Sequence, residues 1–430
     1  MIQKAKDNVF LKSTLILLFG GFAGKLIGFI LKIIITRNLG TETMGLFSLL
    51  SPTTSLLSTI AVFSYSTTLS KLISDKSYRT KDLFTSIIPI SIIINLIIIL
   101  FITINSKFIS ETLFKESRLY LPIICISLTM PFITISAIIK GYFWGKQNMF
   151  PYMLSNFIEQ VARIIVIVLF LNKINNNIYK ICFIILVSIF GEIVSQLVMI
   201  YFFPKTKKEK LKINKLAILD TMKICISTTS SKLIGTFAHF LEPILLTNLL
   251  ILSGYTKDYI IYEYGVINAY SISLLLMPQF FTQNMATSLI PELSKHYSNR
   301  NYDMCKKRIK QVILISTFIG ASSTIVITLF PKFFLNILFK TTEGIDYIRL
   351  LSPFIILFYV QYPLANALQA LGQNKTAFKI SIISSILKLL SITILSFFKL
   401  GMYTLILSIM INLTITTYLY YKETFKILNN

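Results

Sequence analysis

Positively charged side chains lie inside the most apolar stretches of this sequence. The first stretch contains GGFAGKLIGFILK, in which Lys25 and Lys32 are seven residues apart. At 100° per residue, these lysines share one helical face with Gly21, Gly28 and Thr36. A lysine at the centre of a bilayer costs roughly 2.5–3.5 kcal/mol, so we expect this face to line a polar cavity. The alternative for both lysines is that their ammonium groups reach the membrane interface.

A similar face recurs in the second half of the chain. KLIG occurs at 25–28 and again at 232–235, and the same offset aligns Lys32 with His239. The corresponding face carries Thr228, Lys232, Gly235, His239 and Glu242. Lys232 can also reach the interface, and His239 can serve as a simple helix contact.

Further ionisable residues lie in the middle of apolar stretches. Glu159 and Arg163 in NFIEQVARI are four apart, the favourable order for an intrahelical pair. Lys388 in SSILKLLSI occupies nearly the matching place in the second half, while Glu192 and Glu242 are isolated acids. We therefore predict two sets of functional side chains. The candidate ligands of a substrate are Lys25, Lys32, Lys232, Lys388, His239 and Arg163, and the candidates for ion or proton coupling, or for charge pairing, are Glu159, Glu192 and Glu242.

The excess of cations over acids within the apolar stretches favours an anionic ligand. The sequence shows no acidic metal cluster, no glycine-rich phosphate loop and no nucleophile beside a base, so no catalytic residue is predicted. Its four cysteines and two histidines are scattered, so no metal site and no cofactor is expected beyond Na⁺ or H⁺ coupling. The net charge of +24 is attributed to loops beside anionic lipid rather than to nucleic-acid binding.

The elements that carry these residues are predicted to be membrane-spanning helices. The 430-residue chain is 54% hydrophobic and only 14% charged, and apolar runs of 18 or more residues recur along it. We predict an all-α integral membrane protein with about twelve spans. The expected spans are 13–36, 43–67, 84–104, 119–139, 151–171, 181–203, 221–252, 263–290, 312–330, 350–371, 377–398 and 403–421. The sixth-to-seventh connection is strongly basic, and Pro243 predicts a kink or an interfacial first turn in 221–252.

The chain is predicted to fold as two parallel six-helix lobes around a central cavity. Besides KLIG, the pairs TTLSKLISDK with TSLIPELSKH and WGKQNMF with LGQNKTAF recur in the same order in each half. We expect an N-terminal lobe at 1–203, a basic cytoplasmic linker at 204–220 and a C-terminal lobe at 221–430. Inner segments hold about twice as many Lys and Arg residues as outer loops, which predicts that both termini are cytoplasmic.

Three segments resemble the polysaccharide-biosynthesis branch of the multidrug/oligosaccharidyl-lipid/polysaccharide flippase superfamily, with stage V sporulation protein B-like exporters the most similar. They are GKLIGFILKIIITRNLGTETMGLFSL, GYFWGKQNMFPYMLSNFIEQVARII and MPQFFTQNMATSLIPELSKHYSNRN. The resemblance implies a cationic cavity, into which Lys25 would face. Where lipid II flippases carry arginines in the second and eighth helices, this sequence has Ser58 or Thr59, and Ser273.

The resemblance implies a flippase that translocates an undecaprenyl-pyrophosphate-linked oligosaccharide or peptidoglycan precursor by alternating access, for cell-envelope polysaccharide synthesis. It implies a monomer in the bacterial cytoplasmic membrane, with the bilayer, the lipid-linked glycan and envelope glycosyltransferases or polymerases as partners. Two alternatives stay open. One is a cation-coupled multidrug antiporter of the same superfamily, and the other is a non-transport scaffold for envelope-synthesis enzymes.

Overall fold

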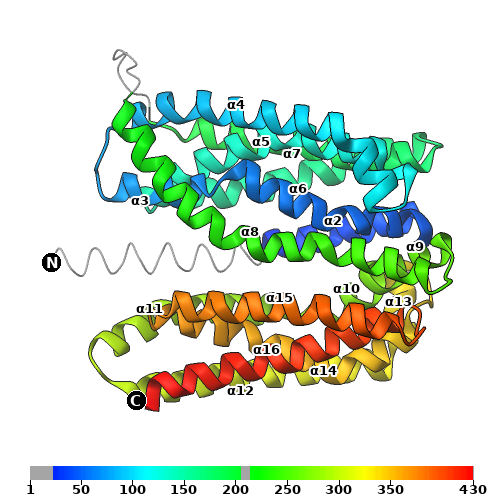
Figure 1. Cartoon of the computed structure of the whole chain (residues 1–430). Helices are drawn as coiled ribbons and strands as arrows, with labels where there is room; N and C mark the ends of the chain where they lie inside the picture. Colours follow the sequence, from blue (N-terminus) through cyan, green and yellow to red (C-terminus); the bar gives the residue numbers. More distant parts are fainter. Residues whose placement is uncertain (1–22, 205–213, 430) are drawn as a thin grey trace. The chain divides into compact units, whose positions relative to one another are not determined.

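The computed structural model describes residues 23–204 and 214–429, and every regular element in these two ranges is a helix (Figure 1). Ten described helices are long and apolar enough to cross a membrane. The bent pair Lys257–Leu276 and Gln279–Ser298 adds an eleventh, and a further helix runs over 23–39. The prediction of an all-α membrane protein with about twelve spans is confirmed.

The described helices form two compact units. The first unit contains the described residues up to Leu39 together with Leu50–Phe240. The second contains Gly40–Leu49 and the chain from Leu241 onwards. The division of the sequence into lobes at 204–220 stays a prediction, and part of that segment lies outside the described residues.

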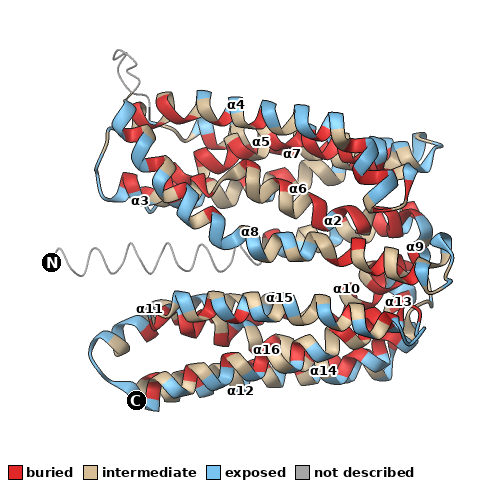
Figure 2. Cartoon of the chain, viewed as in Figure 1, coloured by how far each residue is buried: buried red, intermediate tan, exposed pale blue. Residues whose placement is uncertain are grey.

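The first unit is built around one buried helix. Its helices are the helix at 23–39, most of α2 (Thr41–Val62), then α3 (Tyr65–Ser74), α4 (Thr80–Lys107), α5 (Tyr120–Gly145), α6 (Phe150–Phe170), α7 (Asn177–Tyr201) and the first part of α8 (Lys215–Leu252). A short π-helical segment lies at Phe108–Leu113, and short 3₁₀-helical segments lie at Ser117–Leu119 and Leu171–Lys173. Helix α5 packs against α3, α4 and α7, and Figure 2 shows many of its residues buried. Helix α4 instead exposes apolar side chains, including Ile93, Leu100 and Ile104 at 57%, 63% and 70%, as expected for a lipid-facing helix.

Glycines let α3 lie close to α5. A Cβ atom at Gly141 would lie 2.9 Å from both Leu69 Cβ and Ser66 O. We predict that Gly141→Ala lowers the free energy of unfolding by about 1–3 kcal/mol, because the two helices must separate. Thermal unfolding in detergent, followed by circular dichroism, measures this loss. The matched control is Gly28→Ala, whose Cβ would meet only Gln160 Oε1 at 4.0 Å, and an equal loss in both variants would contradict the prediction.

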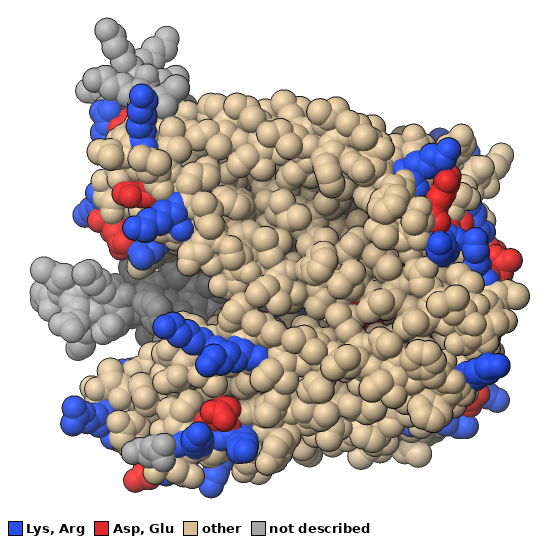
Figure 3. Space-filling view, in the orientation of Figure 1, with Lys and Arg blue, Asp and Glu red and all other residues tan. Residues whose placement is uncertain are grey.

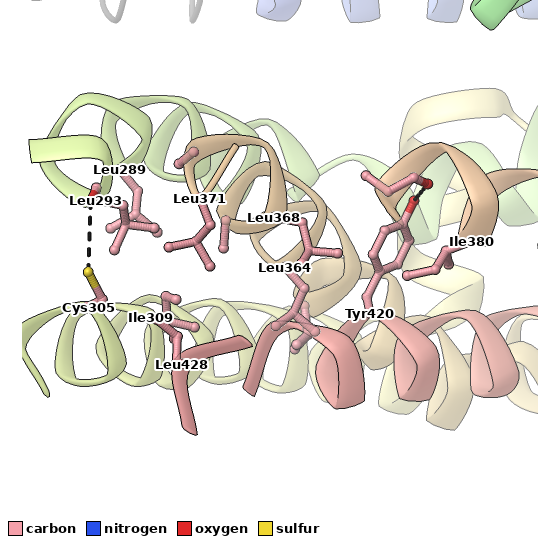
Figure 4. Close-up of a cluster of buried hydrophobic side chains, with 14 residues drawn as sticks. Leu289, Leu293, Cys305, Ile309, Leu364, Leu368, Leu371, Ile380, Tyr420 and Leu428 are labelled. Carbon is pink, nitrogen blue, oxygen red and sulfur yellow. Dashed lines mark hydrogen bonds between the residues drawn. The ribbon is translucent and has the colours of Figure 1, made fainter. Parts of the chain in front are cut away.

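The second unit is built around α14. Its helices are α9 (Lys257–Gly265), a π-helical segment (Val266–Ser271), α10 (Ile272–Leu276), α11 (Gln279–Ser298), α12 (Tyr302–Leu329), α13 (Pro331–Phe339), α14 (Ile345–Ala370), α15 (Asn374–Ser396) and α16 (Tyr403–Asn429). Helix α14 packs against α11, α12 and α16. Figure 4 shows the apolar side chains at one end of this unit, where the Tyr420 hydroxyl donates to Ala377 O at 3.5 Å.

The eighth predicted span, 263–290, is not one continuous helix. It consists of α9, a π-helical segment and α10, followed by α11 after a bend of 57°. The bend coincides with Pro278, which lies between α10 and α11. Proline has no N–H to donate to the preceding helical turn, so a helix breaks readily at this position.

Helix α8 is a single helix of 38 residues that contains Pro243. Its first part packs on the first unit, where Cys225 Sγ donates to Thr68 Oγ1 at 3.3 Å and Thr229 Oγ1 donates to Ser64 Oγ at 3.1 Å. At its start, the Tyr78 hydroxyl donates to Asp220 at 2.5 Å, and this hydrogen bond raises the pKa of Tyr78. Helix α8 therefore passes from the first unit into the second at Phe240 and Leu241.

Charged side chains are concentrated near the ends of the helices. On the face shown in Figure 3, Lys, Arg, Asp and Glu gather at the helix ends of each unit, with other residues between them. An uncharged band of this kind is the surface that a protein presents to the hydrocarbon core of a bilayer. The charges that lie within apolar helices are therefore exceptions that call for an explanation.

Candidate functional site

The helix at 23–39 carries two of the predicted substrate ligands. Lys25 is exposed and Lys32 is half-buried, while Thr36 is buried at 2% exposure. The Thr36 hydroxyl has no hydrogen-bond partner among the described residues. The predicted face on this helix is thus partly present in the structure, although Gly20 and Gly21 lie outside the described residues.

This helix lies against polar side chains of α6. A Cβ at Gly24 would lie 3.1 Å from Asn156 Nδ2, and one at Gly28 would lie 4.0 Å from Gln160 Oε1. The sequence prediction did not include Asn156 or Gln160. A signal was nevertheless present, because Asn156, Gln160 and Arg163 recur at i, i+4 and i+7 on α6.

Helix α6 carries a buried ion pair. Arg163 Nη2 lies 3.0 Å from Glu159 Oε1, and the side chains are 20% and 5% exposed. Nη2 also donates to Ser188 O on α7 at 3.5 Å. Gly191 makes room for the arginine, because a Cβ there would lie 2.5 Å from Arg163 Nε. The positive charge of Arg163 is thus partly neutralised by the Glu159 carboxylate on the same helix.

A second buried acid lies near this pair. Glu192 on α7 is 7% exposed, and its Oε2 atom has no hydrogen-bond partner among the described residues. Glu159 interacts electrostatically with Glu192, Arg163 and Lys140. Lys140, which the prediction did not include, lies near the end of α5 with its Nζ 5.8 Å from the Tyr152 ring centroid. The first unit therefore places two buried acids near one another, and one of them, Glu159, is paired with Arg163.

The second unit contains a buried ion pair between two distant helices. Lys388 Nζ on α15 donates to Glu242 Oε2 on α8 at 2.7 Å, with side chains 24% and 7% exposed. Tyr264, 3% exposed, also interacts electrostatically with Glu242. Arg163 lies on the fifth predicted span of the first half of the chain, and Lys388 lies on the fifth predicted span of the second half. Each of these two cations is therefore paired with an acid in its own unit.

The remaining predicted ligands lie on α8. Lys232 and His239 are both exposed and seven residues apart, so they share one face of this helix. No ion pair of Lys232 is found among the described residues. Within the predicted set, Lys25, Lys232 and His239 are exposed. Arg163 and Lys388 are half-buried, and each forms an ion pair with an acid.

The chemistry of these groups is binding and charge movement. Among the described residues, no group of three or more His, Cys, Asp or Glu side chains could hold a metal ion. Amines and imidazole on exposed helical faces can bind an anion, and buried carboxylates beside cations can exchange a proton or a cation. Which of these side chains bind a substrate stays a prediction.

Comparison with known proteins gives the family context. A model of the family described as polysaccharide biosynthesis protein matches residues 10–297, and the MatE model matches residues 265–395. The chain is 28% identical over 396 residues to stage V sporulation protein B of Bacillus subtilis (strain 168), covering 89% of this chain and 76% of that protein. It is 24% identical over 443 residues to sporulation protein YkvU of the same organism, covering 98% and 96%.

Solved structures agree on the fold. The chain is similar to a multidrug resistance MATE family transporter of the MOP superfamily in its inward-facing conformation. The TM-score is 0.76 at 15% identity, over 94% of each chain. This structural neighbour is a transporter, and the structural likeness extends over nearly the whole chain.

Proposed function

From the premise that this chain belongs to the polysaccharide biosynthesis protein family of MOP-superfamily transporters, we propose that it is a flippase for an undecaprenyl-pyrophosphate-linked glycan. The cargo would be an oligosaccharide-lipid or a peptidoglycan precursor, moved across the bacterial cytoplasmic membrane for envelope polysaccharide synthesis. The similarity to stage V sporulation protein B supports a role in the bacterial envelope. The bilayer and envelope glycosyltransferases or polymerases are the proposed partners, and the protein acts as a monomer.

The observation that carries this proposal is the presence of cations on exposed faces of apolar helices. Lys25 on the helix at 23–39 and Lys232 with His239 on α8 lie within otherwise apolar segments. A pyrophosphate carries negative charges that such side chains can bind, and it offers no apolar surface of its own. The polyprenyl chain would stay in the lipid while the head group binds these cations.

Transport would proceed by alternating access of two parallel repeats. The excess of Lys and Arg in the predicted inner segments supports cytoplasmic termini. Outward movement of an anion is favoured by roughly 2.3 kcal/mol per charge for each 100 mV of a potential that is negative inside. The membrane potential alone can therefore contribute to export of this cargo.

The test of the proposal is rescue of a flippase-deficient bacterial strain. We expect the unmodified chain to restore growth and surface glycan, and purified protein in vesicles to move a fluorescent undecaprenyl-pyrophosphate glycan between leaflets. Failure of both assays, together with resistance to cationic dyes, would favour a multidrug antiporter. Rescue without leaflet movement in vesicles would favour a scaffold for envelope-synthesis enzymes.

A cation-coupled multidrug antiporter is the second candidate function. The acids Glu159 and Glu192, both buried within the first unit, support it, as do the match to the MatE family and the MATE-like fold. An antiporter of cationic drugs needs titratable acids that the drug or a proton can occupy in turn. Dye efflux from cells that express the chain measures this activity.

The buried carboxylates of the first unit also predict that transport is coupled to H⁺ or Na⁺, and this prediction applies to either candidate function. Glu192 is the proposed coupling residue because its Oε2 atom has no hydrogen-bond partner among the described residues. We expect Glu192→Gln to remove the dependence of transport on a pH or Na⁺ gradient, because the amide cannot exchange a proton or bind a cation by charge. Gradient-driven transport in vesicles measures this effect. Glu423→Gln, near the end of α16, is the control, and an unchanged gradient dependence of Glu192→Gln would contradict the assignment.

A further inference from the structure

An apolar groove lies in the second unit at the bend between α10 and α11. Its volume is about 550 Å³, and its lining comes from residues around the bend, from α12 and from Phe334 on α13. All of these residues belong to the second unit. The 57° bend at Pro278 gives the physical reason for the groove. Two segments that meet at this angle cannot both lie along α12, so a space is left beside it.

The groove opens on a face of α12 that is apolar and exposed. Phe318, Ile325 and Leu329 on this helix are all more than half exposed, as expected for a helix in contact with hydrocarbon. Val326, which lines the groove, is also exposed. The groove is therefore accessible from the lipid.

The lining offers little to a polar ligand. Ser322 and Ser323 contribute hydroxyl groups, but both donate to Ile319 O within α12, at 3.2 and 2.6 Å. Among the described residues, no charged side chain lines the groove. A polar group that entered it would lose its hydration without gaining new hydrogen bonds. The chemistry of the lining therefore fits a hydrocarbon chain.

The side chains of the lining also favour one kind of chain over another. Between lipid and an apolar groove the hydrophobic effect gives no preference, so selection depends on how completely a chain fills the groove. Phe281 and Phe334 present aromatic rings, and Met277 presents a flexible, polarizable thioether. A methyl-branched chain with C=C bonds fills the spaces between such side chains and offers π electrons to the rings. A straight, saturated acyl chain does neither.

We propose that this groove binds part of the isoprenoid chain of the lipid-linked cargo. The inference rests on the proposed function, which supplies a cargo with a polyprenyl chain. The chain stays in the lipid, and one part of it lies against the second unit. With the predicted cytoplasmic termini, α12 runs from the inside to the outside of the membrane. The lining residues at 319–327 lie in the second half of this helix, so the groove faces the outer leaflet.

The first test is photo-cross-linking of the full chain in phospholipid vesicles. Undecaprenyl phosphate and phosphatidylglycerol, each with a diazirine in its apolar chain, are compared, so that both lipids carry an anionic phosphate. We expect the polyprenyl lipid to label peptides that contain 277–281 or 319–327 roughly fivefold more, because it fills the groove better. An excess of unlabelled undecaprenyl phosphate should remove this labelling, and the same excess of phosphatidylglycerol should not.

Filling the groove with a side chain provides matched variants for this test. Val326→Trp and Ser322→Phe each place a ring in the groove from a different position on α12. Ile325→Trp is the control, because Ile325 is exposed beside Val326 but does not line the groove. We expect both filled variants to lower polyprenyl labelling to the phospholipid level and the control to leave it unchanged. Equal labelling by the two lipids in the unmodified chain, or unchanged labelling in both filled variants, would overturn the proposal.

A second test asks whether the groove contributes to transport. Leaflet exchange is measured in vesicles for one fluorescent pyrophosphate glycan on an undecaprenyl chain and on a farnesyl chain. We expect Val326→Trp to raise KM several-fold for the undecaprenyl substrate and to leave KM for the farnesyl substrate unchanged, because the short chain has few units to place in the groove. An equal rise for both substrates would contradict a site for the chain.

The cross-linking test uses neither the glycan nor transport, so a wrong assignment of the glycan leaves its result unaffected. Unselective cross-linking together with full rescue of the flippase-deficient strain by Val326→Trp would reject the groove and leave the proposed flippase function intact.

Discussion

Replacing Lys25 and Lys232 with alanine together is expected to abolish transport of the lipid-linked glycan. Each lysine would contribute a charge-assisted hydrogen bond to the pyrophosphate, and two such bonds correspond to about 100-fold in affinity. Leaflet exchange of the fluorescent substrate in vesicles, and its concentration dependence, measure the loss. Because both side chains are exposed, their truncation should leave thermal stability nearly unchanged.

Helix α8 itself provides the control for this prediction. Lys223 is also exposed on α8, nine residues before Lys232 and therefore on the opposite face of the helix. Lys223→Ala combined with Lys25→Ala should transport about as well as Lys25→Ala alone. Full activity of the Lys25→Ala, Lys232→Ala double variant would rule out a cationic contact to the cargo at these positions.

Breaking the ion pair between Lys388 and Glu242 is expected to have the largest effect on stability. Lys388→Met would leave the carboxylate of Glu242, 7% exposed, without its cation. Removing one partner of a buried pair costs about 3–5 kcal/mol. We expect the temperature of thermal unfolding in detergent to fall by several degrees for Lys388→Met. Glu242→Gln combined with Lys388→Met should recover most of the loss, because no buried charge remains.

The same helix again supplies a matched control. Lys379 is exposed on α15, nine residues before Lys388 and on its opposite face, so Lys379→Met should leave the unfolding temperature unchanged. A double-mutant cycle over Glu242 and Lys388 gives the coupling directly. A coupling near zero would show that the 2.7 Å contact contributes nothing to the fold.

The ion pair between Lys388 and Glu242 also affects the predicted role of Lys388 in substrate binding. Its ammonium group can bind a phosphate only after the Glu242 carboxylate moves away or takes up a proton. The same holds for Arg163, whose guanidinium lies 3.0 Å from Glu159. Contact of Lys388 or Arg163 with an anionic head group therefore requires that the acidic partner first be displaced or protonated, and both stay candidates.

The sequence by itself determined the class of the protein. Apolar runs long enough to span a bilayer depend only on local composition, and the described helices follow them. The shared face of Lys25 and Lys32 also depends only on helical periodicity. The segments that resemble the polysaccharide-biosynthesis branch lie within the chain that the family model matches, residues 10–297, or overlap its end.

The tertiary structure decided which of these residues meet. Glu242 and Lys388 are 146 residues apart, and the sequence around Lys388 shows no acid. The first part of α8 packs on α3 through Thr68 and Ser64, and the start of α2 contacts α9 at Gly45. Periodicity fixes the face of a helix on which a residue lies. It does not fix which other helix covers that face or at what height, because that depends on the packing of every element at once.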